Sequence, residues 1–334
     1  MTSCPFNSRT YLSGLAHLGR VETRAGAPFT LLKRPIEGTN RCDGLGAWPY
    51  VFIGRDERLA ALAKAFGDLV TLTLVTQPGY RPSGKVGNAI RFKDHYIYDP
   101  ARASPSLSKR TREHLRRAER AFRFEVVEAP QQRQQIVPLY RELRRRRGLG
   151  GGFFDFPPSH FAMLASLPGA AFFGVKDPEG MTGMACGSAF GDFLQLLHIA
   201  VSDAGLRRDA GYLLMQGVLD FAKENGWRLG LGGLPRPGDV GVVRFKTRWS
   251  NLNERVYLSR FVNDPGAYAE LGHGHETESY FPAYRSAATV VASPPVEPAT
   301  IAVHRGHGRG NSPDLKDQRE PREARRLAAR SVRR

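Results

Sequence analysis

Beyond residue 120 the sequence changes regularly between apolar stretches of strand length and longer amphipathic stretches, and this order restricts the fold more than any other feature. Strands and helices differ in their hydrophobic period, about 2 residues against about 3.6. By this criterion the order is strand, two helices, three strands, helix, strand, helix and strand, over 122–129, 131–147, 153–167, 169–202, 205–227, 228–233, 234–249 and 254–263. Such interleaving predicts an α/β protein with a mixed sheet.

The two ends of the chain have a different character. The first hundred residues read as mixed strand and loop, with strands predicted over 27–35, 48–54 and 70–77 and a helix over 55–69. From residue 286 onward the chain is rich in Pro, Gly, Arg and Ala and nearly lacks large apolar residues. This composition is typical of disorder, so a disordered basic tail is predicted over 286–334.

The positive charge is concentrated in one part of the chain. The formal net charge is +17 and the pI about 10.2, which favours an anionic partner. Residues 102–147 hold 14 Lys and Arg against 5 Glu, over half of this excess. Ser108 is placed to cap a helix there, and residues three and four apart share a helix face. The stretch is either a footprint for a phosphate backbone or two solvated helix surfaces.

The segment 230–249, GLGGLPRPGDVGVVRFKTRW, joins a buried strand to a helix through a glycine-rich loop. Glycine lets a ligand approach the backbone closely, because it carries no side chain. The basic and aromatic residues Arg244, Phe245 and Lys246 follow directly. Such a placement predicts that Gly232 and Gly233 lie against a bound group whose charge these residues meet.

The order of elements is that of the acetyltransferase-like (GNAT) fold, whose acyl-CoA signature R/Q-x-x-G-x-G/A opens the long central helix. At that place this chain has Arg208, Gly211 and then Leu213 where the signature has a small residue. The substitution counts against coenzyme A. A helix start flanked by Arg207 and Arg208 is still able to hold phosphate, and an ordinary charged helix start explains these residues equally well.

Several stretches together resemble the Fem-like (FemABX-type) transferases, a twin-domain branch of this superfamily. The resemblance rests on SLSKRTREHLRRAER, LLHIAVSDAGLRRDAGYLLMQGVLDFAKENG, LGLGGLPRPGDVGVVRFKTRWSNLNERVYLSRFVND, ESYFPAYR and, near the start, WPYVF. It covers roughly residues 30–285 and is strongest over 190–285. It implies twin GNAT domains, a reduced one over 1–105 and a transferase domain over 106–285.

The resemblance implies an enzyme, an acyltransferase that moves an aminoacyl group from aminoacyl-tRNA to an amine and forms a peptide bond. The acceptor is expected to be a peptidoglycan precursor or a small molecule of natural-product biosynthesis. Lys246 is then catalytic, with Phe245 beside it. The donor is expected to contact Arg207, Arg208, Gly211, Gly232, Gly233 and Arg244, and the tRNA to contact Lys109, Arg110, Arg116, Arg117, Arg120, Arg144 and Arg145.

Two further hypotheses stay open. One keeps the fold and the chemistry with acyl-CoA as the donor, and the other is a non-catalytic RNA-binding relative. No cofactor beyond the co-substrate and no metal is expected, because the polar segment 272–278 reads as a loop. Cys186 reads as a buried small apolar residue, and Asp203, Asp220 and Glu224 are possible bases. Without an apolar leader or a membrane-length run, a cytoplasmic protein is predicted.

Overall fold

The structure is a computed structural model that describes residues 4–83, 87–234, 240–273 and 280–286. The predicted tail therefore lies outside the described residues except for Ser286, and so do 235–239 of the glycine-rich loop and 274–278 of the polar segment. The helices are α1 (Arg9–Ser13), α2 (Asp56–Ala65), α3 (Lys109–Ala121), α4 (Pro130–Arg133), α5 (Ile136–Arg147), α6 (Pro158–Ser166), α7 (Asp203–Arg207), α8 (Ala210–Glu224), α9 (Val240–Trp249) and α10 (Pro265–Leu271), with the short η1 (Pro5–Asn7) and η2 (Ala283–Arg285).

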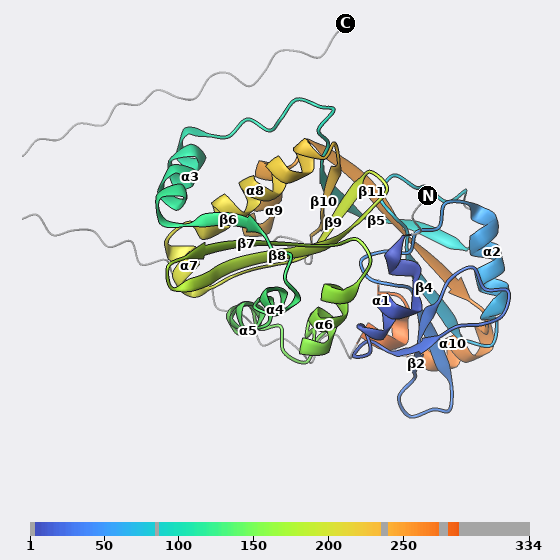
Figure 1. The fold of residues 1–334 in the computed structure, drawn as a ribbon. Coiled ribbons are helices and arrows are strands. Elements are labelled where there is room, and N and C mark those ends of the chain that lie inside the picture. The colour runs from blue at the N-terminus through green and yellow to red at the C-terminus, as the bar shows by residue number, and fades with distance from the viewer. Residues whose placement is uncertain (1–3, 84–86, 235–239, 274–279, 287–334) are drawn as a thin grey trace, which may run out of the picture. The chain divides into compact units, whose positions relative to one another are not determined.

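The strands of the described residues form one 11-stranded mixed sheet in the order β1-β2-β3-β4-β11-β5-β10-β9-β8-β7-β6 (Figure 1). Their bounds are β1 (Arg20–Glu22), β2 (Leu31–Pro35), β3 (Cys42–Leu45), β4 (Thr71–Val75), β5 (Asn88–Tyr98), β6 (Arg123–Val126), β7 (Ala170–Asp177), β8 (Gly180–Phe190), β9 (Phe193–Val201), β10 (Arg228–Gly233) and β11 (Leu252–Val262). Only the β3–β4 and β9–β10 ladders among them are parallel. The predicted mixed α/β class is confirmed.

Helices cover both faces of the β6–β9 part of the sheet (Figure 1). On one face α8 packs on β7 and β8, and α3 packs on α8. On the other face α5 packs on β8 and β9, with α6 beside it. The order of elements predicted beyond residue 120 is confirmed, as is the helix start at Ser108, whose Oγ accepts from the Thr111 amide at 3.2 Å.

Two large buried clusters follow from this layering. The cluster on the α8 face contains the apolar stripe of α8, Leu214, Met215 and Val218, together with Leu115 and Trp249. The cluster on the α5 face joins residues of the first hundred, such as Phe6, Tyr11, Leu31 and Leu74, to Tyr140, Phe161 and Cys186. Cys186 is confirmed as a fully buried apolar residue.

The division at residue 105 stays a prediction. β5 precedes it in the chain, yet β5 pairs with β10 and β11, which follow it. The sheet therefore runs without a break through the two predicted domains. The last strand β11 also pairs with β4 of the first part.

The prediction of a strand over 48–54 is wrong. Only Val51 takes part in pairing there, as an isolated bridge to Thr76. Pro49 has no N–H to donate to a ladder, and a proline also restricts the residue before it. Tyr50 and Ile53 are buried nonetheless, so the apolar character of this segment reflects packing of an irregular stretch.

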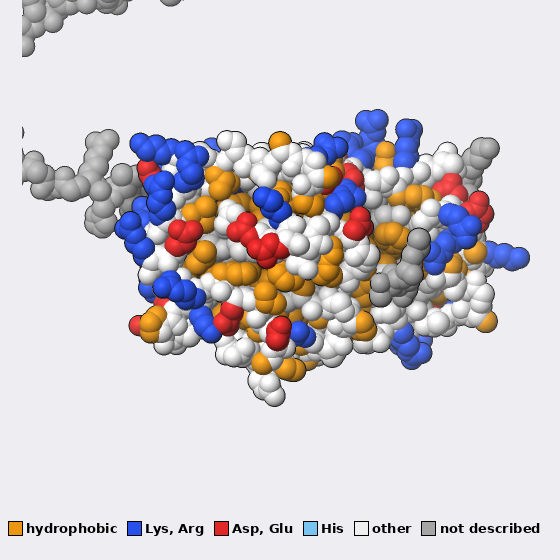
Figure 2. Space-filling view, turned by 45° about the horizontal axis from the view of Figure 1, so that its top comes forward, with side chains coloured by type: hydrophobic (Ala, Val, Ile, Leu, Met, Phe, Trp, Pro, Cys, Tyr) orange, Lys and Arg blue, Asp and Glu red, His pale blue; other side chains and the backbone are white. Residues whose placement is uncertain are grey.

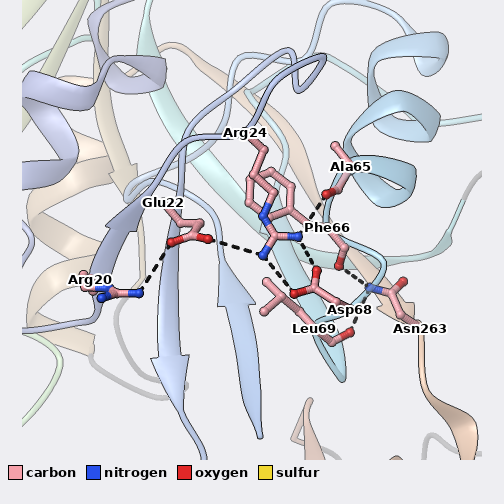
Figure 3. A network of polar contacts seen from close by, with 8 residues as sticks. All are labelled: Arg20, Glu22, Arg24, Ala65, Phe66, Asp68, Leu69 and Asn263. Carbon is pink, nitrogen blue, oxygen red and sulfur yellow. Dashed lines mark hydrogen bonds and ion pairs between the residues drawn. The ribbon is translucent and has the colours of Figure 1, made fainter.

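Polar networks tie the end of β11 to the first part of the chain. Asn263 donates from Nδ2 to the carbonyl oxygens of Phe66 and Leu69, both at 3.0 Å (Figure 3). Beside it, Arg24 binds the Ala65 carbonyl at 3.0 Å and forms an ion pair with Asp68 (Figure 3). The bond to Ala65 satisfies a carbonyl at the end of α2, and the bonds to Phe66 and Leu69 hold the turn that follows α2.

A second polar network holds the segment that contains η2. The Asp43 carboxylate is fully buried and lies between two guanidinium groups, with Arg34 Nε 2.7 Å from Oδ1 and Arg285 bound to Oδ2. The Tyr284 hydroxyl donates to Oδ2 at 3.2 Å. One buried carboxylate of β3 thus joins β2 and η2.

Candidate active site

The strands β9 and β10 separate toward their carboxyl ends. They pair only through Phe193–Gln195 and Arg228–Gly230, although β9 continues to Val201 and β10 to Gly233. α7 and α8 follow β9, and α9 follows β10. The carboxyl ends of diverging parallel strands are where open α/β sheets bind ligands, so the fork between β9 and β10 is the candidate active site.

Gln195 occupies the base of this fork and is 1% exposed. Its Nε2 donates to the carbonyl oxygens of Leu196, at 2.7 Å, and Gly230, at 3.2 Å. Its Oε1 is buried and has no hydrogen-bond partner among the described residues. The side chain therefore joins the two strands where they begin to part and leaves one acceptor free.

A pocket of about 320 Å³ opens on the β9 side of the fork. Its wall is mostly apolar with basic residues at its border, and it is made by Leu143, Arg146, Arg147, Ile199, Val201, Leu206, Asp209, Gly211, Tyr212, Gly241, Val242, Phe245, Arg248 and Trp249. The predicted site residues Gly211 and Phe245 lie in this wall. Arg207, Arg208 and Arg244 do not, and Arg208 instead binds Asp177 at 2.6 Å.

A carboxylate of the chain itself, that of Asp209, already lies at the start of α8. Asp209, in the left-handed conformation with φ 67°, precedes the helix, and its carboxylate lies 2.8 Å from His114 Nδ1 and 2.9 Å from Arg117 Nε. Tyr212 stacks on the His114 ring at 4.5 Å, and the Arg248 guanidinium lies 5.1 Å from the centre of the Tyr212 ring. The place where an acyl-CoA signature would hold pyrophosphate is thus partly neutralised by a carboxylate.

Lys246 lies against the end of β10, whereas its neighbour Phe245 lines the pocket. The Nζ of Lys246 donates to the Gly233 carbonyl oxygen. A Cβ added at Gly232, where φ is +73°, would lie 3.5 Å from Nζ. Burial and the neighbouring Lys93 lower the pKa of Lys246 from 10.5 to about 7. The structure therefore brings Gly232, Gly233 and Lys246 together, as the sequence predicts.

Lys93 and His95 of β5 also lie at the end of β10, beside Lys246, and sequence reasoning missed both. His95 is the register partner of Gly233 across β5–β10. A Cβ added at Gly233 would lie 2.8 Å from Lys93 Cδ and 3.0 Å from His95 Cδ2, so both side chains pack directly on the glycine. Residues two apart in a strand point to the same face of the sheet, so the sequence places Lys93 and His95 on one face. It does not show that their strand pairs with β10.

The predicted tRNA contacts lie on two helices that cover opposite faces of the sheet. Lys109, Arg110, Arg116, Arg117 and Arg120 are exposed on α3, and Figure 2 shows Lys and Arg side chains gathered at the end of the molecule where Figure 1 places α3. On α5 the arginines are paired, since Arg144 binds Asp155 at 2.7 Å and Arg145 binds Asp203 at 2.6 Å.

The possible bases are not at the fork wall beside Lys246. Asp203 is bound by Arg145 and Arg146, and Asp220 accepts from Gln216 at 2.9 Å. Glu224 is exposed at the end of α8. Within the described ranges, no group of three or more His, Cys, Asp or Glu is arranged to hold a metal ion, and no helix is long and apolar enough to cross a membrane.

Comparison with known proteins gives one match to a family model. Residues 105–234 match the family model described as acetyltransferase (GNAT) domain. This part of the chain, 130 of the 334 residues, is therefore similar to a GNAT domain. No curated protein matches the sequence.

Several solved structures share the fold of this chain. The crystal structure of FemX is 12% identical, covers 76% of this chain and 91% of its own, and has a TM-score of 0.54. The C-terminal domain of a putative lysylphosphatidylglycerol synthetase from Agrobacterium fabrum is 15% identical, with 80% and 91% covered and a TM-score of 0.52. L-PGS from Bacillus licheniformis is 16% identical, with 77% and 88% covered and a TM-score of 0.51. The chain therefore shares the fold of FemX and of these synthetase structures, the fold that the sequence resemblance implied.

Proposed function

We propose that this protein transfers an aminoacyl group from aminoacyl-tRNA to an amine and so forms an amide bond. The acceptor is a cell-wall precursor or a biosynthetic small molecule. The observation that carries the proposal is Lys246, whose Nζ is held at the Gly233 carbonyl beside the fork. A cation in a partly dehydrated site, next to Gly232 and Gly233, suits a reaction that develops negative charge on an oxygen.

The chemistry follows from the ester bond of the donor. The neutral amine attacks the ester carbonyl carbon, and the carbonyl oxygen becomes an oxyanion in the tetrahedral intermediate. The ammonium of Lys246 stabilises this oxyanion by a charge-assisted hydrogen bond. When the intermediate collapses, the C–O bond to the ribose breaks, the ribose oxygen takes up a proton, and the amine nitrogen loses one. Phe245, in the wall of the neighbouring pocket, packs against the donor's end.

The start of α8 supports tRNA as the donor over coenzyme A. Asp209 already supplies a carboxylate there, bound to His114 and Arg117. A pyrophosphate at this place would have to compete with Asp209 for His114 and Arg117. The name of one structural neighbour, a putative lysylphosphatidylglycerol synthetase, describes a product that carries a lysyl group, which agrees with aminoacyl transfer.

An acyl-CoA-dependent N-acyltransferase is the second candidate. The pocket of about 320 Å³ at the fork favours it, because Gly211 still leaves part of the helix start open to that pocket. The matched domain model is also named for acetyl transfer. Both candidates use the same fork and the same lysine.

The donor experiment separates the two candidates. The full chain is incubated with a pool of charged tRNA carrying labelled amino acids, and with acetyl-CoA in parallel, each with a panel of amine acceptors. We expect labelled amide only with charged tRNA, and a fall to background after RNase treatment, because RNase degrades the tRNA body through which the protein binds this donor. Release of free thiol from acetyl-CoA, with a product that RNase does not affect, would instead establish the acyl-CoA enzyme.

The exposed cations of α3 provide a test of tRNA binding. Replacing Arg116 and Arg120 by Gln should weaken the affinity for tRNA and reduce the slope of log K against log salt by about 0.7–0.9 for each phosphate that the protein no longer neutralises. Replacing Arg144 and Arg145 by Gln is the matched control on α5. It should have a smaller effect, because Asp155 and Asp203 already bind these two cations. Equal slopes for the wild-type protein and both variants would remove α3 from the interface.

A further inference from the structure

The wall beside Lys246 carries more positive charge than its described neighbours balance. Lys93 lies with its stem on Gly233, and its ammonium is 4.8 Å from the centre of the Phe92 ring. Among the described residues Lys93 has no carboxylate partner, and neither has Lys246. Both lysines are half-buried, and partly dehydrating an ammonium without a partner of opposite charge is costly. Burial lowers the pKa of Lys93 as well.

The carboxylate on the neighbouring strand is already engaged. Glu254 is the register partner of His95 across β5–β11, so their side chains lie on the same face of the sheet. Glu254 forms an ion pair with Arg228 of β10. Among the described residues, the titratable groups around Lys246 are therefore Lys93, His95 and this ion pair, with the Tyr50 ring 6.1 Å from the His95 ring. The pair adds no net charge to the wall.

His95 adds a neutral polar group to the two lysines. It is 2% exposed, and its Nδ1 is buried without a hydrogen-bond partner in the described part of the chain. Burial, Lys93 and Lys246 lower its pKa from 6.5 to about 3, so the imidazole is neutral at physiological pH. The ring atom that packs on Gly233 is Cδ2, which is bonded to Nε2, so Nε2 is the nitrogen on this side of the ring that can offer a hydrogen bond without a further charge.

We propose that Lys93, His95 and Lys246 form a binding site for an oxyanion that the substrate carries permanently, a carboxylate or a phosphate. This oxyanion lies next to the ester or amine that reacts. The role of this oxyanion in the reaction rests on the proposed function. The binding of an anion by the free protein does not depend on it. Two ammonium groups and one neutral imidazole suit a single oxyanion with several lone pairs. The substrate class is thus narrowed to molecules with such a group next to the reacting ester or amine.

Binding of this anion would also prepare Lys246 for its role. With its pKa at about 7, Lys246 is only about half ionised in the free protein at neutral pH. An opposite charge within about 4–6 Å favours the ammonium form and raises the pKa by about 1–3 units. The anion would therefore convert Lys246 into the cation that an oxyanion intermediate needs, and a substrate without the anion would react slowly.

The first experiment measures the anion site without any activity. The pKa of Lys246 is obtained from the pH dependence of its labelling by acetic anhydride, followed by mass spectrometry, with and without inorganic phosphate or acetate. We expect phosphate or acetate to raise the pKa of Lys246 by about one unit or more. Lys223, exposed at the end of α8, is the internal control and should not respond. An unchanged pKa of Lys246 with both anions would overturn the proposal.

Lys93→Met is the variant for this experiment, because it keeps the stem on Gly233 and removes only the ammonium. Without the repulsion from Lys93, the pKa of Lys246 in the free variant should lie above that of the wild-type protein. Neither phosphate nor acetate should raise it much further. A variant in which phosphate acts as strongly as in the wild-type protein would show that Lys93 takes no part in the site.

Kinetics then identify the source of the anion. Lys93→Met should raise KM about 10- to 100-fold for the substrate that carries the oxyanion, the usual result of losing a hydrogen bond to a charged group, with little change in kcat. A raised KM for the donor assigns the anion to a phosphate of the RNA, and a raised KM for the acceptor assigns it to the acceptor. Unchanged values for both would contradict the proposal. If phosphate shifts the pKa of Lys246 but neither donor supports transfer, the anion site stands and the proposed function fails.

Discussion

Lys246→Ala should lower kcat about 10²- to 10³-fold and leave the affinity for the donor nearly unchanged. The ammonium stabilises a charge that exists only near the transition state, so its loss is felt in the rate and not in ground-state binding. If Lys246 only held a phosphate of the donor, the loss would appear as a raised KM, with the rate recovered at saturation. Steady-state kinetics with charged tRNA distinguish these two results.

Two further variants sharpen this prediction. Lys223→Ala removes an exposed lysine from α8 and should keep the wild-type rate. Lys246→Arg keeps a positive charge but changes its reach and shape, so it should restore binding better than it restores kcat. A folded Lys246→Ala protein with the wild-type kcat would remove Lys246 from the active site.

The pH dependence of kcat/KM tests the same group in the free enzyme. Burial and Lys93 lower the pKa of Lys246 to about 7, so the ammonium is present below this pH and is lost above it. For the wild-type protein, kcat/KM for the donor should therefore fall as the pH rises through about 7. In Lys246→Arg this fall should be absent, because a guanidinium stays protonated. A profile shared by both proteins would assign the titration to another group.

Asp43→Ala should lower the free energy of unfolding by about 3–5 kcal/mol, the range found when one partner of a buried ion pair is removed. The Asp43 carboxylate is fully buried, and its loss leaves the Arg34 and Arg285 guanidinium groups without their shared partner. The Tyr284 hydroxyl loses an acceptor as well. Thermal unfolding followed by circular dichroism measures the effect, which we expect to be a fall on the order of 10 °C.

The matched control is an exposed ion pair that also joins the β2–β3 region to a late helix. Glu270 of α10 binds Arg41 at 2.7 Å, with the two side chains 70% and 37% exposed. Because solvent screens this pair, Glu270→Ala should hardly change the melting temperature. Similar melting temperatures for Asp43→Ala and Glu270→Ala would show that the buried carboxylate does not hold η2 to the sheet.

The sequence anticipated the parts of the fold that local patterns determine. The strands and helices beyond residue 120 follow from hydrophobic period, and Ser108 marks a helix start because its side chain caps the amides that follow. Pro138 lies in the first turn of α5, where a proline does not remove an intrahelical hydrogen bond. The strand prediction over 48–54 is wrong because strands and buried irregular segments share an apolar composition.

The residues of the candidate site likewise fall into those that the local sequence predicts and those that only strand pairing brings together. Sequence alone placed Gly232, Gly233 and Lys246 next to one another, because a buried strand, a glycine turn and a helix start succeed each other within a few residues. Only the tertiary structure decided that β5, far earlier in the chain, pairs with β10 and sets Lys93 and His95 on Gly233. Strand pairing between distant segments depends on the packing of the whole sheet, which no local period encodes. The lowered pKa of Lys246 depends on that same pairing, since it arises from burial and from the ammonium of Lys93.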